Sequence, residues 1–85
     1  MKILYSRKFA KEYKKLSNHV KDLAEEKEKI FRKDPFDSKL RTHKLSGKLK
    51  NFWAFSIDRK NRIIFDFDDE KNVRFYSVGG HDIYC

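Results

Sequence analysis

Residues 52–67 alternate between apolar and polar side chains, and this alternation predicts two adjacent β-strands at 52–58 and 62–67. Arg59-Lys60-Asn61 would form the turn between them. In each strand every second residue is large and apolar, so one face of the pair is expected to be buried. The side chains expected on that buried face are Trp53, Phe55, Ile57, Ile63, Phe65 and Phe67.

The opposite face of the second strand carries Arg62, Ile64 and Asp66. A cation in a strand otherwise built of Ile and Phe has two explanations. One face of an antiparallel sheet often meets water, and Arg62 would then be an ordinary surface residue. The other explanation is a function on this face, and the pattern by itself does not distinguish the two.

Two helices are predicted before the strand pair, over residues 7–16 and from about 19 to 33. Ser6 and Ser17-Asn18 are residues that favour helix N-caps, and Asp34-Pro35 ends the second helix because proline restricts the residue before it. Exposed charges of alternating sign disfavour the alternative of a DNA-reading helix-turn-helix. The apolar residues that we expect to pack on the buried face of the sheet include Phe9, Tyr13, Leu23 and Phe31.

Further strands are expected at residues 2–5 and 72–78. The last three predicted strands are joined by short turns and should form a meander, whereas the first returns through the helices and can pair in parallel. A chain of 85 residues is too short for two domains. We therefore predict one α+β domain over residues 1–85 in the order β-α-α-β-β-β, with a small, antiparallel-dominated sheet and a helical hairpin on one of its faces.

The composition adds a strong positive charge to this domain. Lys and Arg total 21 against 13 Asp and Glu, which gives a net charge of +8 and a pI near 9.7. Such a domain is attracted to polyanions, although a solubilising surface or an acidic protein partner would explain the same charge. The basic residues expected to meet a polyanion are Lys39, Arg41, Lys44, Lys48, Lys50, Arg59 and Lys60.

Membrane, secreted and metal-binding proteins are disfavoured. No apolar run approaches the ~20 residues of a membrane span, and the opening MKILYSRKF lacks the long apolar segment of a signal peptide. Cys85 is the single cysteine, so neither a disulfide within the chain nor a cysteine-based zinc site is expected. We expect no membrane partner, no metal or other cofactor, and a cytoplasmic location.

Three segments carry a family resemblance: KILYSRKFAKEYKKL, HKLSG followed by FWAFSIDRKNRIIF, and YSVGGHDIY. In order and spacing they resemble the RelE/ParE superfamily of toxins from bacterial type II toxin–antitoxin pairs, including its RelE-, YoeB- and YafQ-like mRNA interferases. The resemblance covers nearly the whole chain. It implies two helices on one face of the sheet and a concave opposite face, on which RelE-like members cut mRNA on the ribosome. ParE-like members share the fold but inhibit DNA gyrase, so the fold does not settle the function.

RNA cleavage without a metal needs a base for the ribose 2′-OH, an acid for the departing 5′-oxygen and a cation for the phosphate charge. Histidine suits both proton roles because its ordinary pKa, about 6.5, is close to physiological pH. The resemblance implies that His43 and His81 occupy positions where some mRNA-cutting relatives have histidines. It also implies that Arg62 lies against the scissile phosphate and that Tyr84 is the aromatic residue of the C-terminal segment.

Each of these residues has a structural alternative. A lone loop histidine is usually just solvated. Arg62 can instead form an ion pair with Asp58 or Asp66, and Tyr84 can pack under the helices.

The sequence departs from the family's patterns for the general base. Some relatives have a glutamate where this chain has Lys39-Leu40-Arg41, and others have paired lysines where it has Trp53 and Phe55. A third group has an aspartate and a tryptophan where it has Lys60-Asn61. The identity of the base therefore stays open, with the two histidines as the main candidates and Asp58 as a weaker one.

The favoured interpretation is a toxin that acts as a ribosome-associated, metal-independent mRNA endoribonuclease and inhibits translation. A ParE-like, non-enzymatic gyrase inhibitor is the alternative. The expected partners are mRNA, the ribosome and a cognate antitoxin, whose acidic, partly disordered segment would cover the basic concave face.

Overall fold

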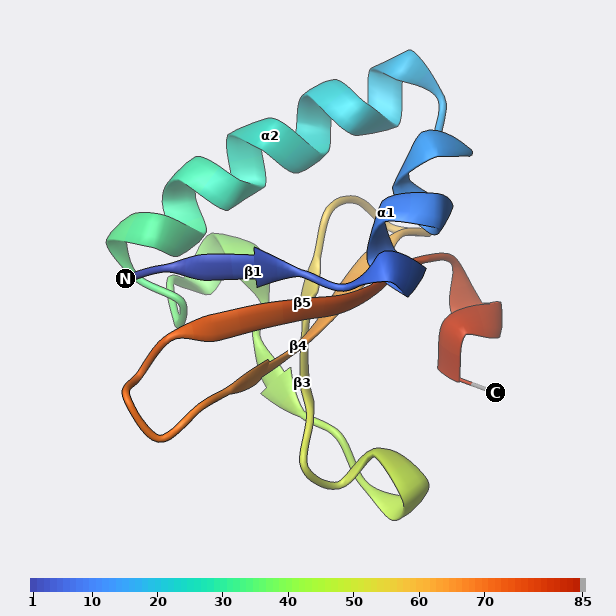
Figure 1. The fold of residues 1–85 in the computed structure, drawn as a ribbon. Helices are drawn as coiled ribbons and strands as arrows, with labels where there is room; N and C mark the ends of the chain where they lie inside the picture. Colours follow the sequence, from blue (N-terminus) through green and yellow to red (C-terminus); the bar gives the residue numbers. More distant parts are fainter. Residues whose placement is uncertain (85) are drawn as a thin grey trace.

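The computed structural model describes residues 1–84, and Cys85 lies outside the described residues. The described chain forms a five-stranded sheet in the order β1-β5-β4-β3-β2, and two α-helices cover one of its faces (Figure 1). The predicted α+β class and the helical hairpin are confirmed. The elements are β1 (Ile3–Tyr5), α1 (Arg7–Lys14), α2 (Asn18–Lys33), η1 (Ser38–Leu40), β2 (His43–Lys44), η2 (Gly47–Leu49), β3 (Trp53–Ser56), β4 (Arg62–Phe67), β5 (Val73–Gly79) and η3 (His81–Tyr84), where η denotes a 3₁₀-helix.

The sheet combines one parallel pair with an antiparallel meander. β1 pairs in parallel with β5, while β3, β4 and β5 follow one another as antiparallel neighbours, as predicted. β2 was not predicted, because two residues are too few to show an alternation. It pairs with β3, and the Leu45 amide extends the pairing by donating to the Phe52 carbonyl at 3.0 Å.

Both helices begin at the predicted serines. The Ser6 hydroxyl accepts a hydrogen bond from the Phe9 amide at 2.9 Å, and the Ser17 hydroxyl accepts one from the Val20 amide at 3.2 Å. Each serine thus satisfies one of the amides that the first turn of a helix leaves without a partner. Among residues 1–84, no helix has the length and apolar character needed to cross a membrane.

The core lies between the helices and the sheet and is built on Phe31 of α2, which is fully buried. Its ring centroid lies 5.0 Å from that of Phe55, 4.9 Å from that of Phe65 and 5.4 Å from that of Phe75. Aromatic packing at these separations adds to the apolar area removed from water. Burial of Phe55, Ile57, Ile63 and Phe65 was predicted and is confirmed.

Two residues of the predicted buried face are less covered than expected. Trp53 is half-buried at the margin of the core, and Phe67 is 37% exposed. Phe67 contacts Trp53 and the exposed Phe36, with ring centroids 6.3 Å apart in both cases. The prediction that Phe67 is largely buried is wrong, because its ring is covered by the exposed Phe36, in the segment after α2, and by the half-buried Trp53.

β5 contains an irregularity that changes which side chains share a face. Its partners on β4 pass from Ile64 opposite Ser77 to Phe65 opposite Phe75, which leaves Tyr76 as an extra residue. Phe75 and Val78 both belong to the core on the helix side. The bulge therefore turns both intervening residues toward the other face of the sheet.

Candidate functional site

The face of the sheet opposite the helices carries both a predicted base and the predicted phosphate-binding cation. Directly paired residues of neighbouring strands point to the same face. His43 pairs with Ala54, and Ala54 pairs with Ile64, which lies two residues from Arg62 on β4. The backbones of His43 and Arg62 are therefore separated by roughly 12 Å, from two strand spacings and two residues along a strand.

Arg62 is held by the turn between β3 and β4. Its Nη1 donates to the carbonyls of Asp58 at 2.6 Å, Arg59 at 3.1 Å and Asn61 at 3.1 Å. Its Nε and Nη2 make no hydrogen bond to any of residues 1–84. The guanidinium is thus fixed at one nitrogen, while two further donors remain for a phosphate.

Neither ion pair considered for Arg62 forms. Asp66 pairs with Arg74, whose Nη2 lies 3.0 Å from Oδ2. The Asp58 carboxylate instead accepts from the amides of Lys60 at 2.9 Å and Asn61 at 2.7 Å. Burial alone would raise the pKa of Asp58, but these hydrogen bonds and the charge of Arg62 outweigh it and leave the pKa below its ordinary value. A carboxylate of lowered pKa is a weak base, so Asp58 is a poorer candidate than the histidines.

The segment after β5 brings His81 and Tyr84 to the end of the sheet where Arg62 lies. Arg62 pairs with Gly79, the last residue of β5, and the chain then turns back as η3. The rings of His81 and Tyr84 meet edge to face with centroids 5.8 Å apart. Burial raises the pKa of the Tyr84 phenol, and the nearby charge of Arg62 only partly offsets this effect. Tyr84 is therefore a neutral hydrogen-bond donor near neutral pH and not a base.

Tyr84 packs on the loop after β2. With Leu45, Ser46, Lys48 and Leu49 it lines a cavity of about 320 Å³. The alternative that Tyr84 packs under the helices is wrong. The C-terminal segment and the loop that follows β2 therefore line the same cavity.

His43 is exposed and has one defined contact, between its Nδ1 and the Arg41 carbonyl at 3.1 Å. A carbonyl can only accept, so a hydrogen bond at this distance requires a proton on Nδ1. In the neutral ring Nε2 then carries the lone pair.

The basic residues predicted to contact RNA do not all share this face. All seven are exposed, but Lys44 pairs with Trp53 and its Nζ lies 5.0 Å from the centre of that ring. Because Trp53 packs against the core, Lys44 lies on the helix side, away from His43. Lys48, by contrast, lines the cavity beside Tyr84. Arg59 and Lys60 lie in the turn that holds Arg62.

A second group on the face opposite the helices was missed by the sequence analysis. The rings of Phe52 and Tyr76 lie 4.9 Å apart, and Lys8 and Arg74 flank the ring of Tyr76 at 5.8 and 5.7 Å. The sequence did hold a signal for it. Val73 and Phe75 alternate as core residues, but Val78 is out of phase with them, as a bulge requires.

Within residues 1–84, no three His, Cys, Asp or Glu side chains gather closely enough to hold a metal ion.

Comparison with known families identifies the group to which the chain belongs. The model of the family described as bacterial toxin of type II toxin–antitoxin system, YafQ, matches residues 1–84. The chain belongs to the YafQ toxin family. This result confirms the resemblance to RelE/ParE-type toxins. No curated protein matches the sequence at a significant level.

Solved structures show the same fold as this YafQ-family chain. YafQ from E. coli strain BL21(DE3) has a TM-score of 0.80 at 20% identity, covering 96% of this chain and 94% of its own. A YoeB/ParE toxin from Agrobacterium tumefaciens also has a TM-score of 0.80, at 13% identity, covering 95% and 99%. The E. coli DinJ-YafQ toxin–antitoxin complex contains a chain with a TM-score of 0.72 at 24% identity, covering 95% and 92%. At these identities the likeness is one of fold.

Proposed function

We propose that this YafQ-family toxin is an mRNA endoribonuclease that acts on translating ribosomes without a metal ion. The observation that carries the proposal is the gathering of Arg62, Tyr84 and His81 at one end of the sheet, on the face that also bears His43. A cation, a neutral phenol and two imidazoles are together sufficient for cleavage through the ribose 2′-OH.

In the proposed reaction Nε2 of His43 takes the proton of the 2′-OH, and the 2′-oxygen attacks the adjacent phosphorus. The bond from phosphorus to the 5′-oxygen breaks, and His81 gives that oxygen a proton. The products are a 2′,3′-cyclic phosphate and a free 5′-OH. Arg62 stabilises the negative charge that builds on the phosphate oxygens, and Tyr84 donates a further hydrogen bond near the same phosphate.

The partner that we propose is a cognate antitoxin. The DinJ-YafQ complex contains a toxin that resembles this chain. The charge of +8 favours an acidic antitoxin segment, and exposed cations such as Lys48, beside the cavity that Tyr84 lines, would meet it.

Single-turnover cleavage of mRNA on ribosomes tests the nuclease with folded variants. Arg62→Ala should slow cleavage by about 10²–10³-fold, as the loss of one oxyanion donor does. His81→Ala and His43→Ala should each slow it by roughly 10²–10⁴-fold, the range for a general acid or base. Lys29→Ala on α2 removes a charge from the helix side and should leave the rate unchanged.

Two results would refute the nuclease. One is full activity in both Arg62→Ala and His81→Ala, and the other is cleavage that EDTA stops while the ribosomes stay intact. Breaks in gyrase-bound DNA, with mRNA left uncut, would instead establish the ParE-like function.

A further inference from the structure

Phe52 and Tyr76 form an aromatic surface that the core does not use. Their ring centroids lie 4.9 Å apart with the ring planes inclined at 34°, and both side chains are only half-buried. They lie on the face opposite the helices, which is also the face of Arg62. Exposed aromatic rings of this kind are what proteins use to stack unpaired nucleobases.

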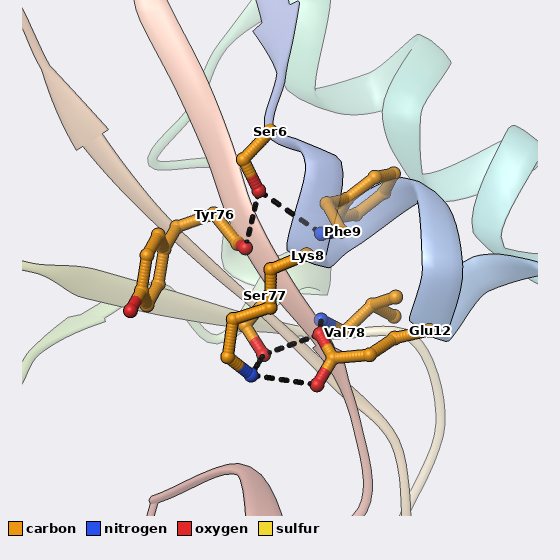
Figure 2. Close-up of polar contacts among 7 residues, drawn as sticks. All are labelled: Ser6, Lys8, Phe9, Glu12, Tyr76, Ser77 and Val78. Carbon is orange, nitrogen blue, oxygen red and sulfur yellow. Dashed lines mark hydrogen bonds and ion pairs between the residues drawn. The ribbon is translucent and has the colours of Figure 1, made fainter.

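The bulge in β5 gives Tyr76 its position, and α1 fixes the bulge on both sides (Figure 2). Before it, the Ser6 hydroxyl donates to the Tyr76 carbonyl at 2.7 Å. After it, Oε1 of Glu12 accepts from the Ser77 hydroxyl at 2.7 Å and from the Val78 amide at 3.1 Å. The backbone at Tyr76 is thus held in place before any ligand arrives, which lowers the entropy lost on binding.

The cations beside Tyr76 are already paired with carboxylates. Nζ of Lys8 lies 2.7 Å from Glu12, and Nη2 of Arg74 lies 3.0 Å from Asp66. The four charges cancel, so this group is a poor site for a phosphate. What it offers a ligand is the exposed part of the two half-buried rings and the plane of the Arg74 guanidinium, which also stacks on bases.

The distance from Arg62 along β4 decides which nucleotide of the RNA could stack on this surface. Tyr76 lies beside Ile64 and Phe65, two to three residues from Arg62 along β4, and Phe52 lies at the level of Asp66, four residues from Arg62. Two to four residues span roughly 7–13 Å of strand. The surface is therefore set apart from Arg62 along the sheet, and it suits a nucleotide other than the one whose phosphate Arg62 binds.

We propose that Phe52 and Tyr76 form a stacking platform for an unpaired nucleobase of the RNA, on a nucleotide other than the one whose phosphate Arg62 binds. The inference rests on the proposed nuclease function, because that function supplies a single-stranded ligand for this face. The platform tolerates any base, since every base has a ring face to stack. It therefore adds affinity and sets the register of the strand without selecting its sequence.

A short RNA with 2′-O-methyl sugars and one 2-aminopurine base tests the platform. Such RNA cannot be cut by attack of a 2′-oxygen, so binding is measured apart from cleavage. Stacking quenches 2-aminopurine fluorescence. At one fixed salt concentration, Tyr76→Ala and Tyr76→Leu should weaken binding by roughly 5- to 150-fold, the range for one stacked base, and remove the quenching. Tyr76→Phe keeps the ring and should bind like the wild type.

The leucine variant fills the space of the ring and keeps the test valid if the alanine variant unfolds. Phe36→Ala removes an exposed aromatic residue from the other side of the sheet and should change nothing. Wild-type binding without quenching, or quenching that survives in Tyr76→Leu, overturns the platform. So does a Tyr76→Leu variant that loses only antitoxin binding, since the surface then serves a protein. Normal quenching by a wild-type chain that cuts no mRNA would refute the nuclease and leave the platform standing.

Discussion

Gly79 offers the sharpest test of how the fold positions the site. A Cβ atom added at this residue would lie 2.7 Å from Cγ2 of Ile83 in η3. Ile83 is branched at Cβ, so it has little rotamer freedom with which to move aside. Gly79→Ala should therefore push η3, with His81 and Tyr84, away from the end of the sheet.

The size of the effect follows from the overlap. Carbon atoms in contact normally stand about 3.5–4.0 Å apart, so η3 must move by roughly 1 Å. A misplacement of about 1 Å in a catalytic arrangement costs on the order of 10²-fold in rate. This corresponds to about 2.7 kcal/mol of transition-state stabilisation.

Gly80 provides the matched control. A Cβ added there would meet Oδ1 of Asp82 and the carbonyl of Lys60 at 3.6 Å each, which is ordinary contact. In single-turnover cleavage on ribosomes, Gly80→Ala should behave like the wild type and Gly79→Ala should be about 100-fold slower. Thermal unfolding of both variants checks that the sheet survives.

A folded Gly79→Ala variant that cuts mRNA at the wild-type rate would show that the position of η3 does not matter for the reaction. Equal losses in the two variants would also contradict the reasoning, because the close approach to Ile83 exists only at Gly79.

Three further predictions concern stability and the partner. Phe31→Ala should lower the free energy of unfolding by about 3–5 kcal/mol in urea titrations. Phe36→Ala, at an exposed position, is the control, and equal losses in the two variants would contradict the core assignment. Burial raises the pKa of Glu12, but its hydrogen bonds outweigh this and hold the pKa below 4.5, its ordinary value. The stability that ionised Glu12 adds is thus present above that value and lost as the pH falls through the lowered pKa, so wild type and Glu12→Gln should converge in urea titrations carried into acid. Lys48→Glu should slow association of an acidic antitoxin several-fold at low salt in stopped-flow measurements, whereas Lys44→Glu, on the helix side, should have less effect.

The sequence predicted those parts of the fold in which apolar residues recur at a regular spacing over a whole element. Strict alternation placed Phe55, Ile63 and Phe65 on the buried face, and the structure agrees. Phe67 continues the same alternation, but its burial depends on what lies above the strand, which no pattern within the strand reports. The bulge at Tyr76 is visible only as a shift of phase between core residues.

The candidate site was predictable in part. The alternation of apolar and polar residues was enough to predict that Arg62 faces away from the helices. It could not show that the Arg62 guanidinium would be held by three carbonyls of its own turn, since that contact depends on the turn's backbone conformation. Nor could spacing along the chain show that His81 and Tyr84 would meet, because their contact follows from the coiling of η3 after Gly79.

The parallel pairing of β1 with β5 has a consequence for how the toxin is made. β1 is synthesised well before β5, which carries its backbone partners: the Val73 amide donates to the Lys2 carbonyl and the Ser6 amide donates to the Phe75 carbonyl. Contacts between residues so far apart in the chain form late in folding. A nascent chain that has not yet reached residue 79 lacks β5, and with it the partner of both β1 and β4. The five-stranded sheet therefore cannot form during synthesis until β5 has been made.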